Sequence, residues 1–137
     1  MTQQNQPVRP LPGPDHDTEG FWEGTKQHKL LIQKCSDCNQ LRHPPQPACA
    51  KCRSLNSEWQ EASGKGTVYS FVVQQHPTHS FFTDVPYNVV LVELEEGTRL
   101  VSNLQGVPAD EVKIGMAVEV VFEDVSDDTT LPFFKLA

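Results

Sequence analysis

The chain carries two matched motifs, Cys35-Ser-Asp-Cys38 and Cys49-Ala-Lys-Cys52, and these four cysteines are the only ones in its sequence. Two residues separate the cysteines within each motif, and ten residues separate the motifs. Paired Cys-x-x-Cys knuckles place four thiolates at the corners of a tetrahedron, which is the geometry of a structural zinc site. We therefore predict a rubredoxin-like zinc ribbon in this part of the chain.

Other uses of the four cysteines are less favoured. Disulfides need an oxidising compartment, and residues 1–20 lack the apolar core of a secretory signal, so we expect a cytoplasmic protein. A thioredoxin-like redox site would use one cysteine pair beside a helix. Iron in a four-thiolate site is the serious alternative, because the ligand type alone does not choose between the two metals. With four protein ligands and no open position for water, the metal is expected to be structural.

The formal net charge of −7 lies entirely in the C-terminal half of the sequence. Residues 1–64 contain seven Lys or Arg and seven Asp or Glu residues, whereas residues 65–137 contain four and eleven. An acidic surface of this kind repels a phosphate backbone, which argues against binding of nucleic acid. No apolar run approaches membrane-spanning length, so we expect no membrane segment.

Composition and patterning divide the chain into four predicted parts. Residues 1–14 are rich in Gln, Pro and Gly and are expected to form a flexible tail. Residues 15–29 are expected to form a short helix, with acidic residues at its start and basic residues at its end, as the helix dipole favours. Residues 30–62 make up the predicted zinc ribbon, with strands expected over residues 30–33 and 58–61. Residues 63–137 make up a predicted β-barrel.

The predicted helix carries an apolar stripe of Phe21, Trp22 and Thr25. Asp17 or Thr18 is placed to cap its first turn. Two interpretations of the aromatic pair stay open at this point. Phe21 and Trp22 either pack on their own domain or dock on a partner protein.

The C-terminal half shows a β pattern, with five strands predicted over residues 67–74, 87–94, 98–104, 117–123 and 131–136. In the first strand, Val68 and Val72 are expected to share one face, with Tyr69, Phe71 and Val73 on the other. Five short strands without a long helix favour a closed or nearly closed barrel of the OB type, with an SH3-like barrel as the alternative. The expected fold class is therefore mainly β.

The connection over residues 75–86 is long for a hairpin loop and contains His76, His79, Phe81 and Phe82. Adjacent aromatic side chains are costly to leave in water, so they are expected to be buried against something. One interpretation is a plug at an end of the barrel. The favoured interpretation is a binding loop that contacts a partner or an apolar ligand.

No convincing catalytic site is apparent in the sequence. The motifs GxSxG, GxGxxG and HExxH and a P-loop are absent, and the metal takes all four thiols. His76 and His79 with Asp84 offer only a weak acid and base alternative. We therefore expect a chain that is not catalytic by itself.

The joint order of several short motifs resembles one known family. These motifs are Phe21–Gly24, Gln33–Cys38, Pro44-Pro45, the second knuckle, Gly64–Phe71, Pro86-Tyr87, Ile114–Val120 and Leu131–Phe134. From about residue 15 to residue 137, the chain resembles the zinc-ribbon, OB-fold family of acyl-CoA-associated proteins. Asn39 follows the first knuckle, where left-handed backbone is often needed, and asparagine tolerates that conformation. In that family a glycine often stands at this position.

The resemblance implies a function as well as a fold. Members of this family usually accompany a thiolase-like enzyme in assemblies that carry out thiolysis, acyl transfer or retro-aldol cleavage on acyl-CoA substrates, including intermediates of steroid side-chain breakdown. The thiolase-like chain holds the catalytic residues, and the zinc-ribbon chain completes the complex. Some relatives carry the module fused to a hydratase-like domain, and none is expected in this sequence. The implied partner is thus a thiolase-like subunit that shares its acyl-CoA substrate in a hetero-oligomer.

The side chains predicted to contact the partner or acyl-CoA are Phe21, Trp22, His76, His79, Phe81, Phe82 and Tyr87. Three other functions stay open. A stand-alone acyl-CoA binder would show affinity in isolation, a nucleic-acid-binding ribbon–barrel would bind single strands in a salt-dependent way, and a rubredoxin-like electron carrier would hold iron.

Overall fold

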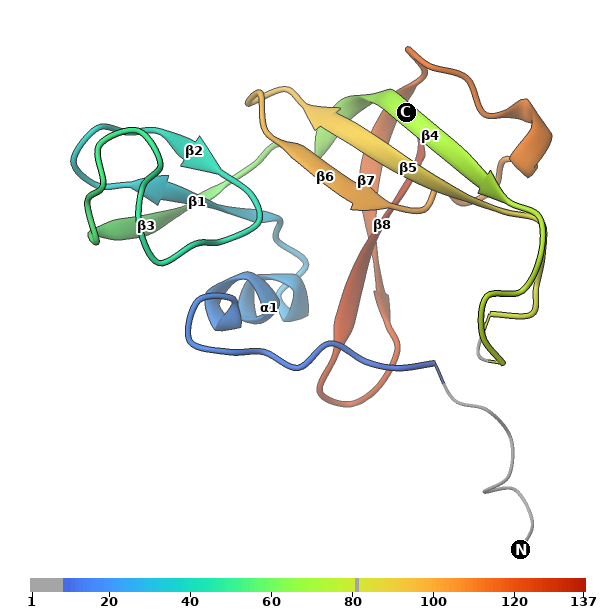
Figure 1. The fold of residues 1–137 in the computed structure, drawn as a ribbon, viewed down its shortest axis with the longest axis horizontal. Helices are drawn as coiled ribbons and strands as arrows, with labels where there is room; N and C mark the ends of the chain where they lie inside the picture. Colours follow the sequence, from blue (N-terminus) through green and yellow to red (C-terminus); the bar gives the residue numbers. More distant parts are fainter. Residues whose placement is uncertain (1–8, 81) are drawn as a thin grey trace, which may run out of the picture.

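The computed structural model describes residues 9–80 and 82–137, which fold into one α-helix and two antiparallel β-sheets (Figure 1). The mainly β class predicted from the sequence is confirmed. Within the described residues, no helix has the length and apolar composition needed to cross a bilayer. The helix and the smaller sheet lie on one side of the molecule, and the larger sheet forms the other side (Figure 1).

The helix α1 spans Glu19–Lys26 and is shorter than the predicted range of residues 15–29. A turn precedes it, in which the carboxylate of Asp15 accepts the backbone N–H groups of Asp17 and Thr18, each at 3.0 Å. Hydrogen bonds from Thr18 lower the pKa of Asp15 below its usual value. Thr18 occupies the N-cap position without a capping bond from its own side chain, so neither predicted cap forms. Asp15 replaces them because its carboxylate organises the turn before the helix.

The smaller sheet contains three strands in the order β2-β1-β3, namely β1 (Leu31–Cys35), β2 (Leu41–Arg42) and β3 (Ser57–Glu61). The sequence predicted β1 and β3 but not the two-residue β2, which is too short to show a periodic pattern. The central strand β1 pairs with both neighbours, with Gln33 opposite Arg42 on one side and opposite Trp59 on the other.

The larger sheet contains five strands in the order β6-β5-β4-β7-β8. These are β4 (Lys65–Gln74), β5 (Tyr87–Leu94), β6 (Arg99–Ser102), β7 (Ala117–Asp124) and β8 (Thr130–Leu136). A short 3-10 turn, η2 (Ala109–Glu111), separates β6 from β7. All five strands lie within two residues of the bounds predicted from the sequence.

The two ends of the larger sheet meet just after β6. Leu104 forms a parallel bridge with Phe134, the amide of Gln105 donates to the Phe134 carbonyl at 2.7 Å, and the Phe134 amide donates to the Asn103 carbonyl at 3.1 Å. The sheet is therefore curled upon itself and joined at its edges, as in a partly open five-stranded OB barrel. Phe134 is fully buried at this junction.

A β-bulge in β4 overturns the predicted alternation of its side chains. Val68 pairs with Val92, but Ser70 pairs with the adjacent Leu91, so Tyr69 is the extra residue. Each bulge shifts the alternation of side chains by one position. As a result Val68 is buried, whereas Val72 is 61% exposed on the other face, although the sequence placed both on the same face.

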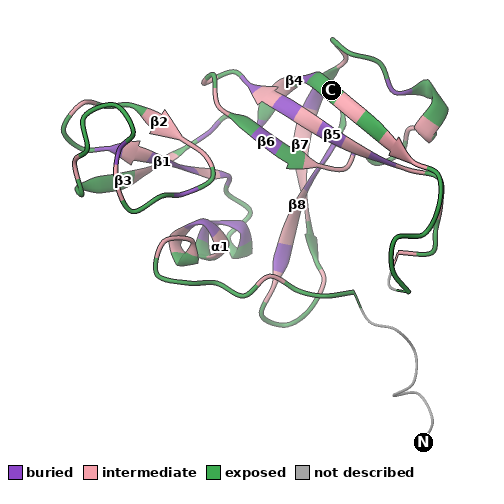
Figure 2. Cartoon of the chain, viewed as in Figure 1, coloured by how far each residue is buried: buried purple, intermediate pink, exposed green. Residues whose placement is uncertain are grey.

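The helix, the small sheet and the barrel share one hydrophobic core. Phe21 from α1 and Ile32 from β1 belong to the same buried cluster as Val90 and Phe134 of the barrel. Figure 2 shows buried residues in α1 and at intervals along the strands of both sheets. The ribbon and barrel therefore pack as a single unit, since neither module covers its own apolar face completely.

A second contact joins the end of α1 to the barrel. His28, which has a φ of 60°, stacks on Phe122 at 5.3 Å between ring centroids, and its Nε2 lies 3.4 Å from Oδ1 of Asp124. Thr130 donates its hydroxyl to the same carboxylate oxygen at 2.6 Å. The hydrogen bond from Thr130 and that from His28 lower the pKa of Asp124 below its usual value.

Gly20 permits close packing between α1 and β3. A Cβ placed there would overlap the indole of Trp59, whereas a Cβ at Gly13 would meet nothing within 4 Å. The helix thus uses a glycine despite its low helix propensity, because the strand approaches too closely for any side chain.

We predict that Gly20→Ala lowers the free energy of unfolding, although Ala alone would favour the helix by about 1 kcal/mol. Overpacking against Trp59 should cost about 1–3 kcal/mol and outweigh that gain. Denaturant unfolding measures the difference, with Gly13→Ala as the control that should leave stability unchanged. A Gly20→Ala protein as stable as the wild type would show that Trp59 moves aside freely.

Candidate metal centre and binding groove

The four cysteine sulfurs form one compact cluster in the described part of the chain, where all four Sγ atoms lie within 4.8 Å of one another. The Sγ atoms of Cys35 and Cys52 are 3.5 Å apart, and those of Cys38 and Cys49 are 3.6 Å apart. Tetrahedral zinc with bonds of about 2.3 Å holds its sulfurs about 3.8 Å apart. The four thiols therefore fit one tetrahedral metal ion.

Two backbone turns of the same design hold the cysteines. The Asn39 amide donates to the Cys35 carbonyl at 2.9 Å, and the Arg53 amide donates to the Cys49 carbonyl at 2.8 Å. Asn39 and Arg53 both adopt left-handed backbone, with φ of 65° and 64°. The sequence predicted this conformation for Asn39. The sequence did not predict this conformation for Arg53. The available signal was position alone, because Arg53 follows the second knuckle as Asn39 follows the first.

The protein environment promotes the thiolate form at the first cysteine of each knuckle. The backbone N–H of Cys38 lowers the pKa of the Cys35 thiol, and that of Cys52 lowers the pKa of the Cys49 thiol to about 6. For Cys52, the Ser54 amide lowers the pKa, but the neighbouring sulfurs outweigh it and raise the value to about 12. Four thiolates this close repel one another, and a divalent cation among them removes that repulsion.

The metal centre is closed. Cys35 and Cys49 are buried, and the described chain adds no His, Asp or Glu to the cluster. His43 instead lies against Phe21, with 5.3 Å between ring centroids and 43° between the ring planes, and its burial lowers its pKa to about 4. With four protein ligands and no position for water, a metal here supplies rigidity rather than catalysis.

The barrel and ribbon also enclose a groove with two connected cavities. The larger one, of about 840 Å³, lies beside the start of β5 and the end of β6. The smaller one, of about 350 Å³, lies between α1, β6 and β8. Arg9 and the segment Val101–Asn103 line both cavities, so they mark the point where the two meet.

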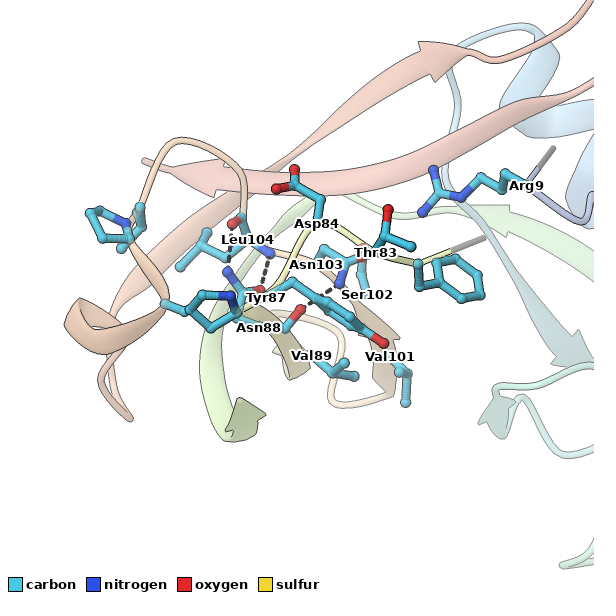
Figure 3. Close-up of a pocket in the computed structure, with 15 residues that line it drawn as sticks. Arg9, Thr83, Asp84, Tyr87, Asn88, Val89, Val101, Ser102, Asn103 and Leu104 are labelled. Atoms are coloured by element: carbon cyan, nitrogen blue, oxygen red, sulfur yellow. Dashed lines mark hydrogen bonds between the residues drawn. The ribbon is translucent and has the colours of Figure 1, made fainter. Parts of the chain in front are cut away.

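A buried asparagine shapes the larger cavity (Figure 3). Asn88 donates its side-chain N–H to the Leu104 carbonyl at 2.9 Å and accepts the Leu104 amide at 2.7 Å. Asn103 donates to the Asn88 carbonyl at 2.5 Å. These hydrogen bonds from Asn88 therefore hold the segment that follows β6 in the position where that segment contacts β8. Sequence reasoning missed it, although a polar residue within an apolar strand is a recognisable signal.

Part of the predicted contact set gathers at this groove. Tyr87 and Phe82 line the larger cavity, with 6.4 Å between their ring centroids, and Trp22 lines the smaller one. Arg9 lies 5.9 Å from the centroid of the Phe82 ring and 5.6 Å from that of Phe133, within cation–π range. Phe21 also lines the smaller cavity. Its ring packs edge-to-face against the ring of Trp22, with 4.9 Å between the ring centroids.

The remaining predicted residues lie elsewhere. His76 and His79 are exposed and line neither cavity, whereas Asp84 lines the larger one, so the three do not share a wall of the groove. Phe81 falls outside the described residues. Phe21 is only 4% exposed, so Trp22 contributes most of the solvent-exposed surface of this aromatic pair. Contact of these side chains with a partner or acyl-CoA stays a prediction.

A closed metal ribbon joined to a small barrel defines a class of structural and scaffolding modules. Comparison with known proteins identifies the family. Residues 22–58 match the family model described as the ChsH2 rubredoxin-like zinc ribbon domain, and residues 59–123 match the ChsH2 C-terminal OB-fold domain. The chain belongs to the DUF35 family, with the zinc ribbon and OB-fold domains of the ChsH2 type. The predicted family resemblance is thereby confirmed.

Several curated relatives carry informative names. The chain is 44% identical to a probable enoyl-CoA hydratase alpha subunit of Thermomonospora curvata over 98% of its length. It is 43% identical over 85% of its length to the 3-oxo-4,17-pregnadiene-20-carboxyl-CoA hydratase alpha subunit of Mycobacterium tuberculosis. The chain spans only 42% and 37% of these two relatives. A DUF35 domain-containing scaffold protein of Methanocaldococcus jannaschii is 34% identical, with 78% of this chain and 77% of that protein covered.

Solved structures agree with these matches. A chain of the Ltp2-ChsH2(DUF35) aldolase superposes with a TM-score of 0.84 at 45% identity, covering 91% of this chain and 98% of that one. A DUF35 protein of unknown function from Sulfolobus solfataricus matches with a TM-score of 0.62 at 21% identity, covering 89% and 86%. The second match supports the fold alone.

We predict that removing the metal with a strong chelator unfolds at least residues 30–61, because metal binding and folding are coupled in such modules. Circular dichroism and amide hydrogen exchange, followed before and after chelation, measure the loss. Adding back the metal should restore the ordered ribbon. Full protection of β1 and β3 after the metal is gone would contradict a structural role for the ion.

We also predict that Asn88→Ala destabilises the barrel by about 1–3 kcal/mol, because it leaves the buried amide and carbonyl of Leu104 without partners. Urea unfolding gives the change in free energy. Asn103→Ala is the matched control, since it removes a single hydrogen bond to the same strand and should cost less. Equal losses in the two variants would argue against the special role of Asn88.

Proposed function

We propose that the chain is a non-catalytic, zinc-containing accessory subunit that binds and completes a thiolase-like enzyme acting on acyl-CoA substrates. The observation that carries the proposal is the correspondence with a chain of the Ltp2-ChsH2(DUF35) aldolase over 91% of the sequence. The name of that complex pairs a DUF35 chain with a second component in an aldolase. The reaction proposed for the complex is retro-aldol cleavage, with thiolysis or acyl transfer as alternatives.

The relatives support a role beside another subunit. Two of them are named alpha subunits of CoA-ester hydratases, and one of these names a steroid-type pregnadiene carboxyl-CoA substrate. Others are named scaffold proteins. An acyl-CoA substrate, with steroid side-chain breakdown as its setting, is therefore the substrate class that we propose for the complex.

The geometry supports an accessory role. The four-cysteine centre has no open ligand position, and its proposed zinc ion would hold the ribbon rigid rather than activate water. The groove offers aromatic surface from Trp22, Phe82 and Tyr87 rather than an assembled acid and base. A rigid wall of this kind is suited to shaping a site whose reacting groups come from the partner.

Charge limits which part of an acyl-CoA reaches this chain. All of the net charge of −7 lies in residues 65–137, which form most of the barrel. Such a surface repels the phosphates of CoA. The acyl or pantetheine part is therefore the portion that we expect near the Phe82 side of the groove, with the phosphates held by the thiolase-like subunit.

The test is purification of the tagged, zinc-loaded chain with candidate thiolase-like enzymes from its source, followed by mass measurement of the complex and assay on acyl-CoA substrates. A stoichiometric complex that is active only with both chains is the expected result. If every candidate stays separate while the isolated chain binds acyl-CoA in titration calorimetry, the stand-alone binder replaces this proposal. Elemental analysis of the same sample should give zinc equimolar with the chain, whereas a red, iron-containing protein would indicate an electron carrier.

We predict that Trp22→Ala combined with Phe82→Ala weakens assembly with the partner by about tenfold or more, because buried aromatic anchors dominate interface energies. Titration calorimetry or surface plasmon resonance measures the dissociation constant. Leu55→Ala is the matched control, since Leu55 is 76% exposed on the ribbon and lines neither cavity. Unchanged affinity in the double variant would remove the groove from the interface.

A further inference from the structure

The second half of β4 has an open edge. β4 pairs with β5 from Gly66 to Gln74, but it pairs with β7 only over Lys65–Thr67. Gly115 and Met116 extend the contact as far as Val68. Within the described residues, no backbone hydrogen bond joins residues 69–74 to any segment other than β5. In Figure 1 this half of β4 continues with β5 into an arm that projects from the barrel.

This edge lacks the usual protection against pairing with another chain. Exposed edges are normally blocked by charged residues or proline, or covered by another element. Residues 69–75 contain no Lys, Arg, Asp, Glu or Pro. The bulge at Tyr69 lies at the start of the open stretch and leaves the following residues extended and regular.

The side chains along the open edge are apolar on both faces. Val72 is 61% exposed, and its cross-strand neighbour on β5 is the half-buried Val89. Phe71 and Val73, which point to the other face, are both half-buried. An incoming strand would therefore find apolar surface above and below the row of unpaired backbone groups.

We propose that this open edge pairs with the same edge of a second copy of the chain, in an antiparallel arrangement about a two-fold axis at Val72. The sequence from Ser70 to Gln74 is symmetric in polarity about that residue. Antiparallel pairing places Val72 opposite its own copy, Phe71 opposite Val73 and Ser70 opposite Gln74. Every apolar side chain then meets an apolar one, and the two barrels share a continuous sheet.

The open edge is a part of the barrel surface where charge does not oppose a second copy. Each copy carries a net charge of −7, so most of its barrel surface repels the same surface on another copy. The strip over residues 69–75 is free of acidic groups and allows close approach. A two-fold interface also needs a surface that is complementary to itself, which this strip provides.

The first test is the mass of the zinc-loaded chain in solution, measured by sedimentation and light scattering from low to high micromolar concentration. The expected result is a reversible monomer–dimer equilibrium that shifts towards dimer at higher salt, because screening weakens the repulsion. Val72→Lys should abolish the dimer, since it places two like charges opposite each other. A chain that stays monomeric at every concentration overturns the proposal.

Leu55→Lys is the matched control. Leu55 is 76% exposed on the ribbon, lines neither cavity and lies outside the larger sheet that contains β4. Both variants should keep the circular dichroism spectrum and metal content of the wild type. A dimer that survives Val72→Lys, or one lost equally in both variants, overturns the proposal. Loss of binding to a thiolase-like partner without loss of the dimer in Val72→Lys would assign the edge to that partner and also overturn it.

Oxidative cross-linking tests the register without relying on loss of a dimer. Directly opposed residues in antiparallel strands have Cα atoms about 4.5–5.5 Å apart, which suits a disulfide. Val72→Cys should therefore give a cross-linked dimer on a non-reducing gel that Leu55→Cys does not give, with the metal bound in both. Equal cross-linking of the two variants, or none in Val72→Cys, contradicts the proposed pairing.

Discussion

The structure depends first on the gathering of four thiols around one metal position. The ribbon has only a small apolar core of its own. Its buried apolar side chains are Leu30, Ile32, Cys35, Pro45, Cys49 and Ala62. A sheet with so little buried surface needs an additional constraint to stay folded. A metal ion held by the four thiols would supply it, and the ribbon presents Pro44 and its neighbours as one wall of the groove.

A second constraint is the closure of the curled sheet. The paired hydrogen bonds between Asn88 and Leu104 fix the segment after β6, and the contact of Leu104 with Phe134 joins the two ends of the sheet. This closure positions both cavities, because Asn88 and Leu104 line the larger one and Ser102 and Asn103, just before Leu104, line the smaller one as well. The groove is therefore a consequence of how the barrel closes.

The bulge at Tyr69 links the fold to the surfaces that it offers. By shifting the alternation of β4, it turns Val72 outward while it keeps Val68 in the core. Beyond the bulge, β4 separates from β7 and leaves its edge open. The molecule thus presents two distinct apolar surfaces, the groove between ribbon and barrel and the edge of the projecting arm. Two such surfaces are consistent with a protein whose role lies in assembly.

The sequence by itself determined the local structures whose signals are local. The cysteine spacing specified the ribbon and the left-handed turn at Asn39, and alternating apolar residues specified the five strands of the barrel. Only the tertiary structure decided which of these residues meet. Burial of Phe21, the clamp by Asn88 and the exposure of Val72 depend on packing, edge closure and a one-residue bulge. These arise between segments distant in sequence, so no local pattern encodes them.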